Sequence, residues 1–155
     1  MGNLTYVAEQ VANESALSRS GTEFIAGASI YVNGTSTTLY INDSDCTWLK
    51  LNSTSGDISY LRFDGVGEIE NTKITSWNTT TSDHDRHDDA SFPRSYVQYM
   101  YGSRGNITNS NLSYLGYNAI YKRGVGFYNC ANGIVENSTF AELYEGYISG
   151  DRIIL

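Results

Sequence analysis

The feature that most constrains the fold is a six-residue unit that occurs three times. It reads IENTKI at 69–74, ITNSNL at 107–112 and VENSTF at 135–140. The unit stays constant while the distance between its copies changes, so loops of different length separate similar strands. Stacked coils explain this pattern, because each coil buries its apolar side chains against the same positions of its neighbour. The repeat predicts an all-β chain that forms a right-handed parallel β-helix, a solenoid with irregular loops between coils.

The central asparagines of the unit, Asn71, Asn109 and Asn137, are predicted to form a ladder of turns. Asparagine tolerates the left-handed backbone conformation that a sharp turn between strands needs, and its amide can bond to the asparagine of the next coil. The alternative is an antiparallel sandwich in which these asparagine turns coincide by chance.

The rest of the chain fits one domain, since 155 residues are enough for one core and too few to expect two. Residues 1–22 are interpreted as an N-terminal cap or lead-in strand, and residues 23–155 as the β-helix domain. Short β-branched and aromatic runs bounded by Gly, Asn, Asp and Ser predict strands at 24–26, 29–32, 38–41, 47–51 and 58–63.

The charge of the chain limits the classes of partner that it is expected to bind. Only 17% of the residues are charged and the formal net charge is −7, which disfavours nucleic acid because binding it needs clustered lysine and arginine. No apolar run is long enough to predict a transmembrane segment. We expect the partner to be either a second copy of the chain, in a homo-oligomer or filament, or a polysaccharide.

Glycosylation sequons and two cysteines indicate an extracellular or cell-surface location. Asn-x-Ser/Thr begins at Asn3, Asn13, Asn33, Asn42, Asn52, Asn78, Asn106, Asn111 and Asn137. Cys46 and Cys130 are candidates for a disulfide in an oxidising compartment. The alternative is a pair of buried thiols, since the sequence does not place the two residues within bridging distance.

One loop concentrates the ionisable side chains. Its candidate metal ligands are Asp83, His84, Asp85, His87 and Asp88. Histidine suits zinc-like ions and carboxylates suit a divalent cation such as calcium, although neither full ligand pattern is met. A general base is a second reading, and a solvated loop without cofactor is the third.

Three tyrosines close together offer a contact surface. Tyr96, Tyr99 and Tyr101 do not share one parity, so at least one is expected to face outward from the strand. Outward aromatic rings suit sugar or subunit contacts, and the alternative is that these rings fill interior columns.

Four stretches in the same order resemble a known family. They are ITSWN at 74–78, RSYV at 94–97, SYLGY at 113–117 and STFAELYEGY at 138–147. Over roughly residues 45 to 150 the chain resembles the β-helix of mannuronan C5-epimerases and of epimerase-like archaeal surface proteins. The family's catalytic Asp-Pro-His-Asp motif is not in this sequence, whose single proline is Pro93. The resemblance therefore implies the scaffold of such an enzyme, and it assigns no catalytic residue here.

Two functional hypotheses follow. The first is a non-catalytic, self-assembling structural component of a cell surface, such as an envelope, sheath or filament subunit. The alternative is part of a carbohydrate-active enzyme that acts on polyuronates, a C5-epimerase or lyase, or a polysaccharide-binding module.

Overall fold

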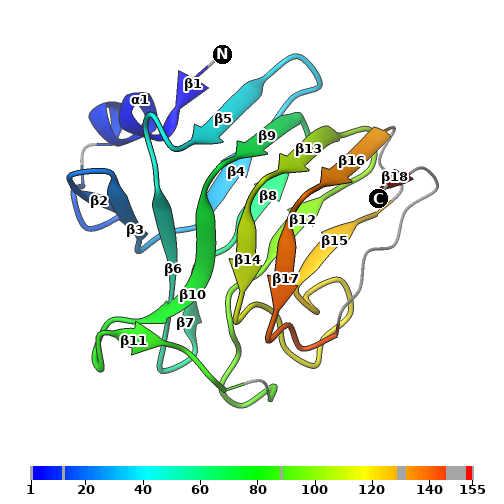
Figure 1. Ribbon diagram of the computed structural model, residues 1–155. Coiled ribbons are helices and arrows are strands. Elements are labelled where there is room, and N and C mark those ends of the chain that lie inside the picture. The colour runs from blue at the N-terminus through cyan, green and yellow to red at the C-terminus, as the bar shows by residue number, and fades with distance from the viewer. Residues whose placement is uncertain (1, 12, 88, 129–131, 146–152, 155) are drawn as a thin grey trace.

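The computed structural model describes residues 2–11, 13–87, 89–128, 132–145 and 153–154. The chain winds into coils, and each full coil places one strand in each of three parallel sheets, here called sheets A, B and C (Figure 1). The strands follow one another in the order B, C, A along the chain. The predicted all-β parallel β-helix is thereby confirmed.

The three sheets stack strands from successive coils. Sheet A contains β1 (Gly2–Asn3), β5 (Thr38–Asn42), β9 (Val66–Glu70), β13 (Arg104–Thr108), β16 (Asn132–Glu136) and β18 (Ile153–Ile154). Sheet B contains β2 (Leu17–Ser20), β3 (Glu23–Ala26), β6 (Trp48–Thr54), β10 (Lys73–Asn78), β14 (Asn111–Ser113) and β17 (Thr139–Ala141), with β7 (Asp57–Ile58) and β11 (Asp83–His84) added as short antiparallel strands. Sheet C contains β4 (Ile30–Val32), β8 (Leu61–Phe63), β12 (Val97–Tyr99) and β15 (Val125–Phe127).

The repeated unit forms the corner between sheets A and B. Its first apolar residue is the second-last residue of the sheet A strand, where Ile69 pairs with Ile107 and Ile107 with Val135. Its last apolar residue lies in the sheet B strand, where Leu112 lies between Ile74 and Phe140. Equivalent residues of the unit therefore stack directly on one another and form two columns of the core.

The asparagines of the unit occupy the turn itself. Asn71, Asn109 and Asn137 have φ angles of 50°, 50° and 48°, in the left-handed region. The amide ladder that we expected does not form among the described residues. The hydroxyls that follow the asparagines link the coils instead: the backbone N–H of Thr72 donates to Ser110 Oγ at 3.2 Å, and that of Ser110 to Ser138 Oγ at 3.1 Å. The asparagines themselves are exposed.

An aromatic column runs through the core beside a column of glycines. The rings of Phe63, Tyr99 and Phe127 stack at centroid distances of 4.6 and 4.4 Å. Opposite them, Gly67 pairs with Gly105 and Gly105 with Gly133 in sheet A. A Cβ atom at Gly105 would lie 2.0 Å from the Tyr99 ring, so the glycines make the space that the rings fill.

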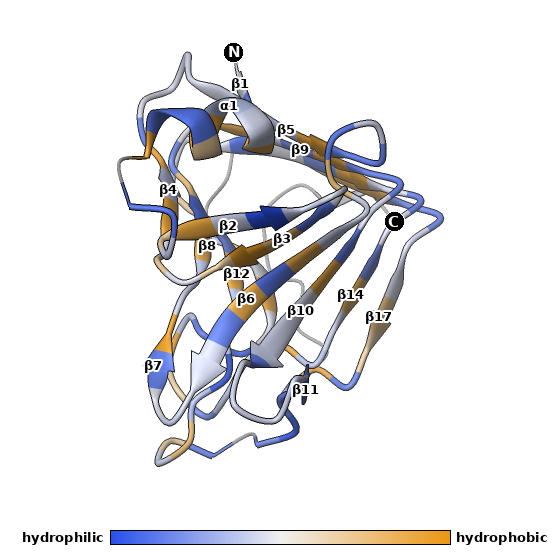
Figure 2. Cartoon of the chain, turned by 90° about the vertical axis from the view of Figure 1, so that its left-hand side faces the viewer, coloured by the Kyte–Doolittle hydropathy of each residue, from blue (hydrophilic) through white to orange (hydrophobic). Residues whose placement is uncertain are grey.

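The first residues form a cap over one end of the coils. The helix α1 (Leu4–Gln10) lies at the N-terminal end of the stack (Figures 1 and 2) and buries Leu4 completely. The carboxylate of Asp45 holds the helix start, since Leu4 N–H donates to its Oδ2 at 2.8 Å. After the helix, β2 pairs antiparallel with β3. Within the described part of the chain, no helix has the length and apolar character needed to cross a membrane.

Candidate functional site

Sheet B exposes a cluster of aromatic and basic side chains on its outer face. Figure 2 shows β3, β6, β10, β14 and β17 side by side on this face. In β6, Leu49 and Leu51 point into the core, so Trp48 and Lys50 point outward from the same strand. We call this surface the Trp–Lys cluster, which contains Trp48, Lys50, Lys73, Trp77, His84 and Tyr114.

The two tryptophans hold a lysine between them. The rings of Trp48 and Trp77 meet edge to face at a centroid distance of 5.2 Å. Lys50 Nζ lies 4.0 Å from the centroid of Trp48 and 4.4 Å from that of Trp77. Trp48 Nε1 also donates to Thr75 Oγ1 at 2.9 Å, across the pair of strands β6 and β10. These contacts fix the indoles and leave both of them partly exposed.

The short strand β11 brings His84 onto the cluster. It pairs antiparallel with β10, and the imidazole lies 5.6 Å from the ring of Trp77 and 4.6 Å from that of Tyr114. Lys73 Nζ lies 3.1 Å from His84 Nε2. Because an ammonium group only donates, Nε2 accepts, which assigns the ring proton to Nδ1, where Asp83 Oδ1 lies 3.2 Å away.

Lys73 supplies the positive charge of the cluster. Lys50 is paired with Glu23 at 2.6 Å, whereas Lys73 makes no ion pair with any described carboxylate. Burial lowers the pKa of Lys73, and the nearby charge of Lys50 lowers it further. Its Nζ lies 4.0 Å from the centroid of Trp48. Glu23, which pairs with Lys50, acts on Lys73 only through its charge, so a carboxylate on a sugar that stacks on the indoles can pair with this ammonium group.

The loop that follows β10 separates the predicted metal ligands. His84 faces the Trp–Lys cluster, while His87 Nδ1 lies 2.8 Å from Oδ1 of the buried Asp85. Among the described residues, no three His, Cys, Asp or Glu side chains come together as a metal site would require. Asp88 lies outside the described residues, so the divalent-cation site remains a prediction.

The tyrosines divide between interior and surface. Tyr99 is fully buried in the aromatic column, and Tyr96 is buried against Tyr60 at a centroid distance of 4.9 Å. The sugar or subunit contacts expected of Tyr96 and Tyr99 are wrong for this reason, because neither ring reaches the surface. Tyr101, just after β12, is 82% exposed and is the outward-facing member of the three.

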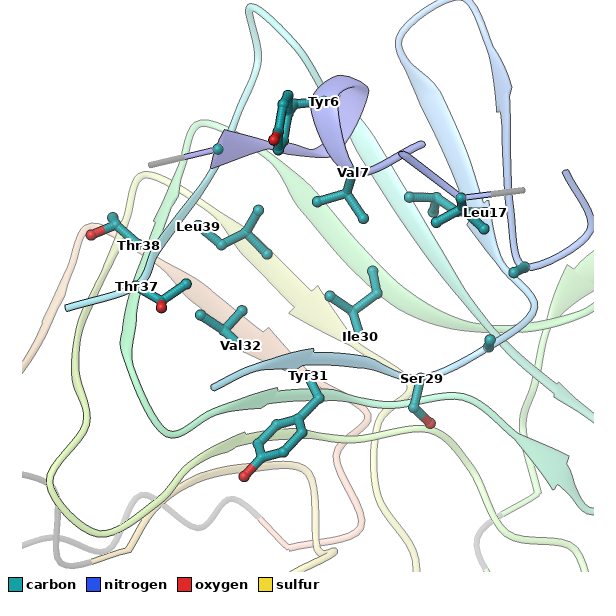
Figure 3. A pocket seen from close by; sticks show the side chains of 14 residues that line it. Tyr6, Val7, Leu17, Ser29, Ile30, Tyr31, Val32, Thr37, Thr38 and Leu39 are labelled. Atoms are coloured by element: carbon teal, nitrogen blue, oxygen red, sulfur yellow. The ribbon is translucent and has the colours of Figure 1, made fainter. Parts of the chain in front are cut away.

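An apolar cavity of about 390 Å³ opens at the N-terminal end of the coils. Figure 3 shows Val7 of α1 and Ile30, Val32 and Leu39 of the first strands pointing into it, whereas Tyr31 points away. The cavity lies at the end of the stack where β1 and β2 are the edge strands of sheets A and B. The edge strand of sheet C at this end is β4, and no described strand pairs with its outer edge. The first coil therefore leaves one sheet edge and part of its core open.

The sequons and the two cysteines were the features that indicated an extracellular setting. None of the nine sequon asparagines is buried, and glycosylation itself remains a prediction. Cys46 is buried, and burial raises the pKa of its thiol to about 12. Cys130 lies outside the described residues, so the disulfide between them also remains a prediction.

Sequence reasoning missed the Trp–Lys cluster. Trp48 and Lys50 share one face of β6, and Lys73 and Trp77 share the same face of β10. The sequence does contain aromatic and basic residues at alternating positions in these two strands. That they form one cluster follows only from the register, in which Lys73 lies opposite Trp48.

Comparison with known proteins supports the fold. No protein-family model matches the chain, and no curated protein matches it. Among solved structures, the periplasmic alginate epimerase AlgG matches with 22% identity and a TM-score of 0.81, covering 92% of this chain and 35% of the epimerase. A mutant form of AlgG matches with 22% identity and a TM-score of 0.84, covering 96% and 37%. The chain spans about a third of the length of these structures and shares their parallel β-helix fold, as the resemblance to mannuronan C5-epimerases predicted.

Proposed function

We propose that this protein is a non-catalytic β-helix of the cell envelope that binds an acidic polysaccharide on the outer face of sheet B. The observation that carries the proposal is the Trp–Lys cluster, in which two fixed indoles lie beside two lysines. Lys50 is paired with Glu23, whereas Lys73, over the ring of Trp48, makes no ion pair with a described carboxylate. Sugar rings present C–H faces that stack on indoles, and uronate sugars add a carboxylate that an ammonium group can bind.

Two further observations support this reading. The fold is shared with a protein described as a periplasmic alginate epimerase, and polyuronates are the substrates that the family resemblance implies. The nine sequon asparagines, none of which is buried, agree with a location outside the cell. The overall negative charge of the chain makes non-specific binding of polyanions unfavourable, so a local cationic site is required.

Binding of polymannuronate by isothermal titration calorimetry tests the proposal. Trp77→Ala and Lys73→Gln are each expected to weaken binding about tenfold, the equivalent of 1.4 kcal/mol. Tyr101→Ala removes an exposed aromatic ring elsewhere and is the matched control, expected to bind like the wild type. Equal affinity of all variants would exclude this face. Turnover of polymannuronate, followed by proton NMR at the sugar C1 signals, would contradict the non-catalytic part.

A second function, end-to-end self-assembly, is favoured by the open edge of β4. Ile30 N–H donates to Tyr60 and Val32 C=O accepts from Asp64, so both residues turn their backbone groups toward β8. In a parallel strand the residue between them, Tyr31, turns its N–H and C=O the other way, toward the open edge beside the cavity. A strand of a second copy can pair there.

Two substitutions of the same residue test assembly. Tyr31→Pro removes the edge N–H, whereas Tyr31→Ala keeps it and removes only the ring. Sedimentation velocity is expected to show oligomers for wild type and Tyr31→Ala, and monomers for Tyr31→Pro. Oligomers that persist in Tyr31→Pro, or a wild type that is monomeric at all concentrations, would rule out assembly through this edge.

A further inference from the structure

A second group of polar and aromatic side chains lies on the outer face of sheet C. We call it the Tyr31 cluster, which consists of Tyr31, Tyr60, Arg62 and Asp64. Tyr31 of β4 pairs with Arg62 of β8, and the guanidinium lies 5.0 Å from the centre of the Tyr31 ring. Arg62 also binds Asp64 through two parallel hydrogen bonds, from Nε to Oδ1 at 2.9 Å and from Nη2 to Oδ2 at 3.0 Å.

The cluster is held in one arrangement by its own contacts. The Tyr31 hydroxyl donates to Asp64 Oδ2, so the ring, the guanidinium and the carboxylate fix one another. Hydrogen bonding from Arg62 holds the pKa of Asp64 below its ordinary value, and the bond to Asp64 raises the pKa of Tyr31. At neutral pH the group therefore presents a paired cation and anion with no net charge.

The unused hydrogen-bonding capacity of this pair fits a hydroxyl better than an anion. Arg62 has five N–H donors and uses two of them on Asp64. The carboxylate of Asp64 accepts from Arg62 and Tyr31 and keeps a free lone pair on Oδ1. A sugar hydroxyl both accepts and donates, so it can bond to Arg62 and Asp64 together, whereas a uronate carboxylate would be repelled by Asp64 at the same distance.

Aromatic surface lies beside these polar groups. Tyr31 points away from the N-terminal cavity (Figure 3) and is 49% exposed. Arg62 lies over the ring, and the exposed part of Tyr31 is the surface on which a sugar would stack. Tyr60, also partly exposed, precedes Arg62 on the same outer face and is stacked on Tyr96 with an interplanar angle of 7°. The cluster thus combines a ring platform with a donor and an acceptor, as sugar sites do.

We propose that the Tyr31 cluster is a second carbohydrate site that binds a neutral pyranose chain. The exposed face of Tyr31 stacks on the sugar, and Arg62 and Asp64 bind a pair of its hydroxyls. The site differs in ligand class from the Trp–Lys cluster, where Lys73 has no ion pair with a described carboxylate. The two clusters lie on different sheets, so one molecule can hold an acidic and a neutral polysaccharide at once.

NMR titration of the folded chain with cellohexaose and mannohexaose tests the site. We expect saturable shifts for the wild type with at least one hexasaccharide, about tenfold weaker binding for Tyr31→Ala, and less than about threefold weaker binding for Tyr31→Phe, which keeps the ring. Asp64→Asn keeps the shape and is expected to weaken binding because it loses the charged acceptor. Circular dichroism establishes that each variant is folded.

Trp77→Ala separates this proposal from the acidic-polysaccharide site. It is expected to leave hexasaccharide binding unchanged, and Tyr31→Ala is expected to leave polymannuronate binding unchanged. Absence of polymannuronate binding from the wild type, or undiminished binding by Trp77→Ala, would therefore overturn the first site and not this one. The Tyr31 site is overturned if neither hexasaccharide binds the wild type, or if Tyr31→Ala binds as tightly as the wild type.

Discussion

At the scale of single residues, burial decides which chemically reactive groups are available. Cys46 lies in the core, and its backbone carbonyl accepts a hydrogen bond from the Thr72 hydroxyl of the next coil. Arg94, the first residue of the RSYV stretch, is buried as well and donates from Nε to Gly116 O at 2.9 Å. Both residues stabilise the coils, and neither is open to a ligand.

The thiol of Cys46 is predicted to be unreactive in the folded chain. Burial raises its pKa from 9.0 to about 12, so at pH 8 its thiolate fraction falls about a thousandfold and labelling slows in proportion. The test is labelling with a thiol reagent in a Cys130→Ser background, which leaves Cys46 as the single cysteine. Labelling as fast as in the urea-unfolded chain would contradict the burial.

The raised pKa of Cys46 also predicts how the free energy of unfolding changes with pH. The folded thiol has the higher pKa, so its contribution is fully present below pH 9 and is lost as the pH rises through about 12. Cys46→Ala removes this dependence and is the control in urea titrations at pH 8 and pH 10.5.

At the scale of strands and corners, the sequence predicted the part of the fold that repeats in sequence. Ile69, Ile107 and Val135 could be aligned from the six-residue unit, so the corner between sheets A and B was predictable. The sheet C strands contain only three residues each and carry no shared motif, which hid the stack of Phe63, Tyr99 and Phe127. The Trp–Lys cluster was not predicted either. It depends on the register between coils and on His84, which β11 places beside β10.

The glycine column beside the aromatic column is predicted to be essential for packing. In Gly105→Ala the new methyl group meets the Tyr99 ring at 2.0 Å and Gly67 O at 2.7 Å, so the stack must shift. We expect a loss of about 3 kcal/mol in the free energy of unfolding, measured by urea titration.

Gly102→Asn is the control for this change. Gly102 has a φ of 79°, which asparagine tolerates, and open space around its Cβ position, so its cost is expected to stay below about 1 kcal/mol. If Gly105→Ala and Gly102→Asn cost the same, the aromatic column is looser than the contacts indicate.

At the scale of the whole molecule, the N-terminal cap determines how much of the coil end is open. The helix α1 covers part of the first coil, and its attachment depends on the buried carboxylate of Asp45, which accepts from the N–H groups of Leu4 and Thr5. The edge of β4 and the cavity beside it stay uncovered. Capping and assembly therefore use neighbouring parts of the same end of the β-helix, and loss of the cap would enlarge the surface that is open to a second copy.

Asp45→Ala is predicted to release the cap and increase self-association. The change leaves the N–H of Leu4 without its acceptor, at a cost of about 1 to 3 kcal/mol, and frees α1 to leave the apolar end of the coils. Hydrogen exchange is expected to rise in residues 4–10 and to stay low in β9 and β13. Sedimentation velocity is expected to show larger oligomers than the wild type.

Asp45→Asn keeps one carbonyl acceptor, so its degree of self-association should fall between those of the wild type and Asp45→Ala. Adding Tyr31→Pro to Asp45→Ala should return the chain to monomers, because the exposed end then lacks the edge N–H that a second copy needs; oligomers in the double variant would mean that the coils associate through another surface.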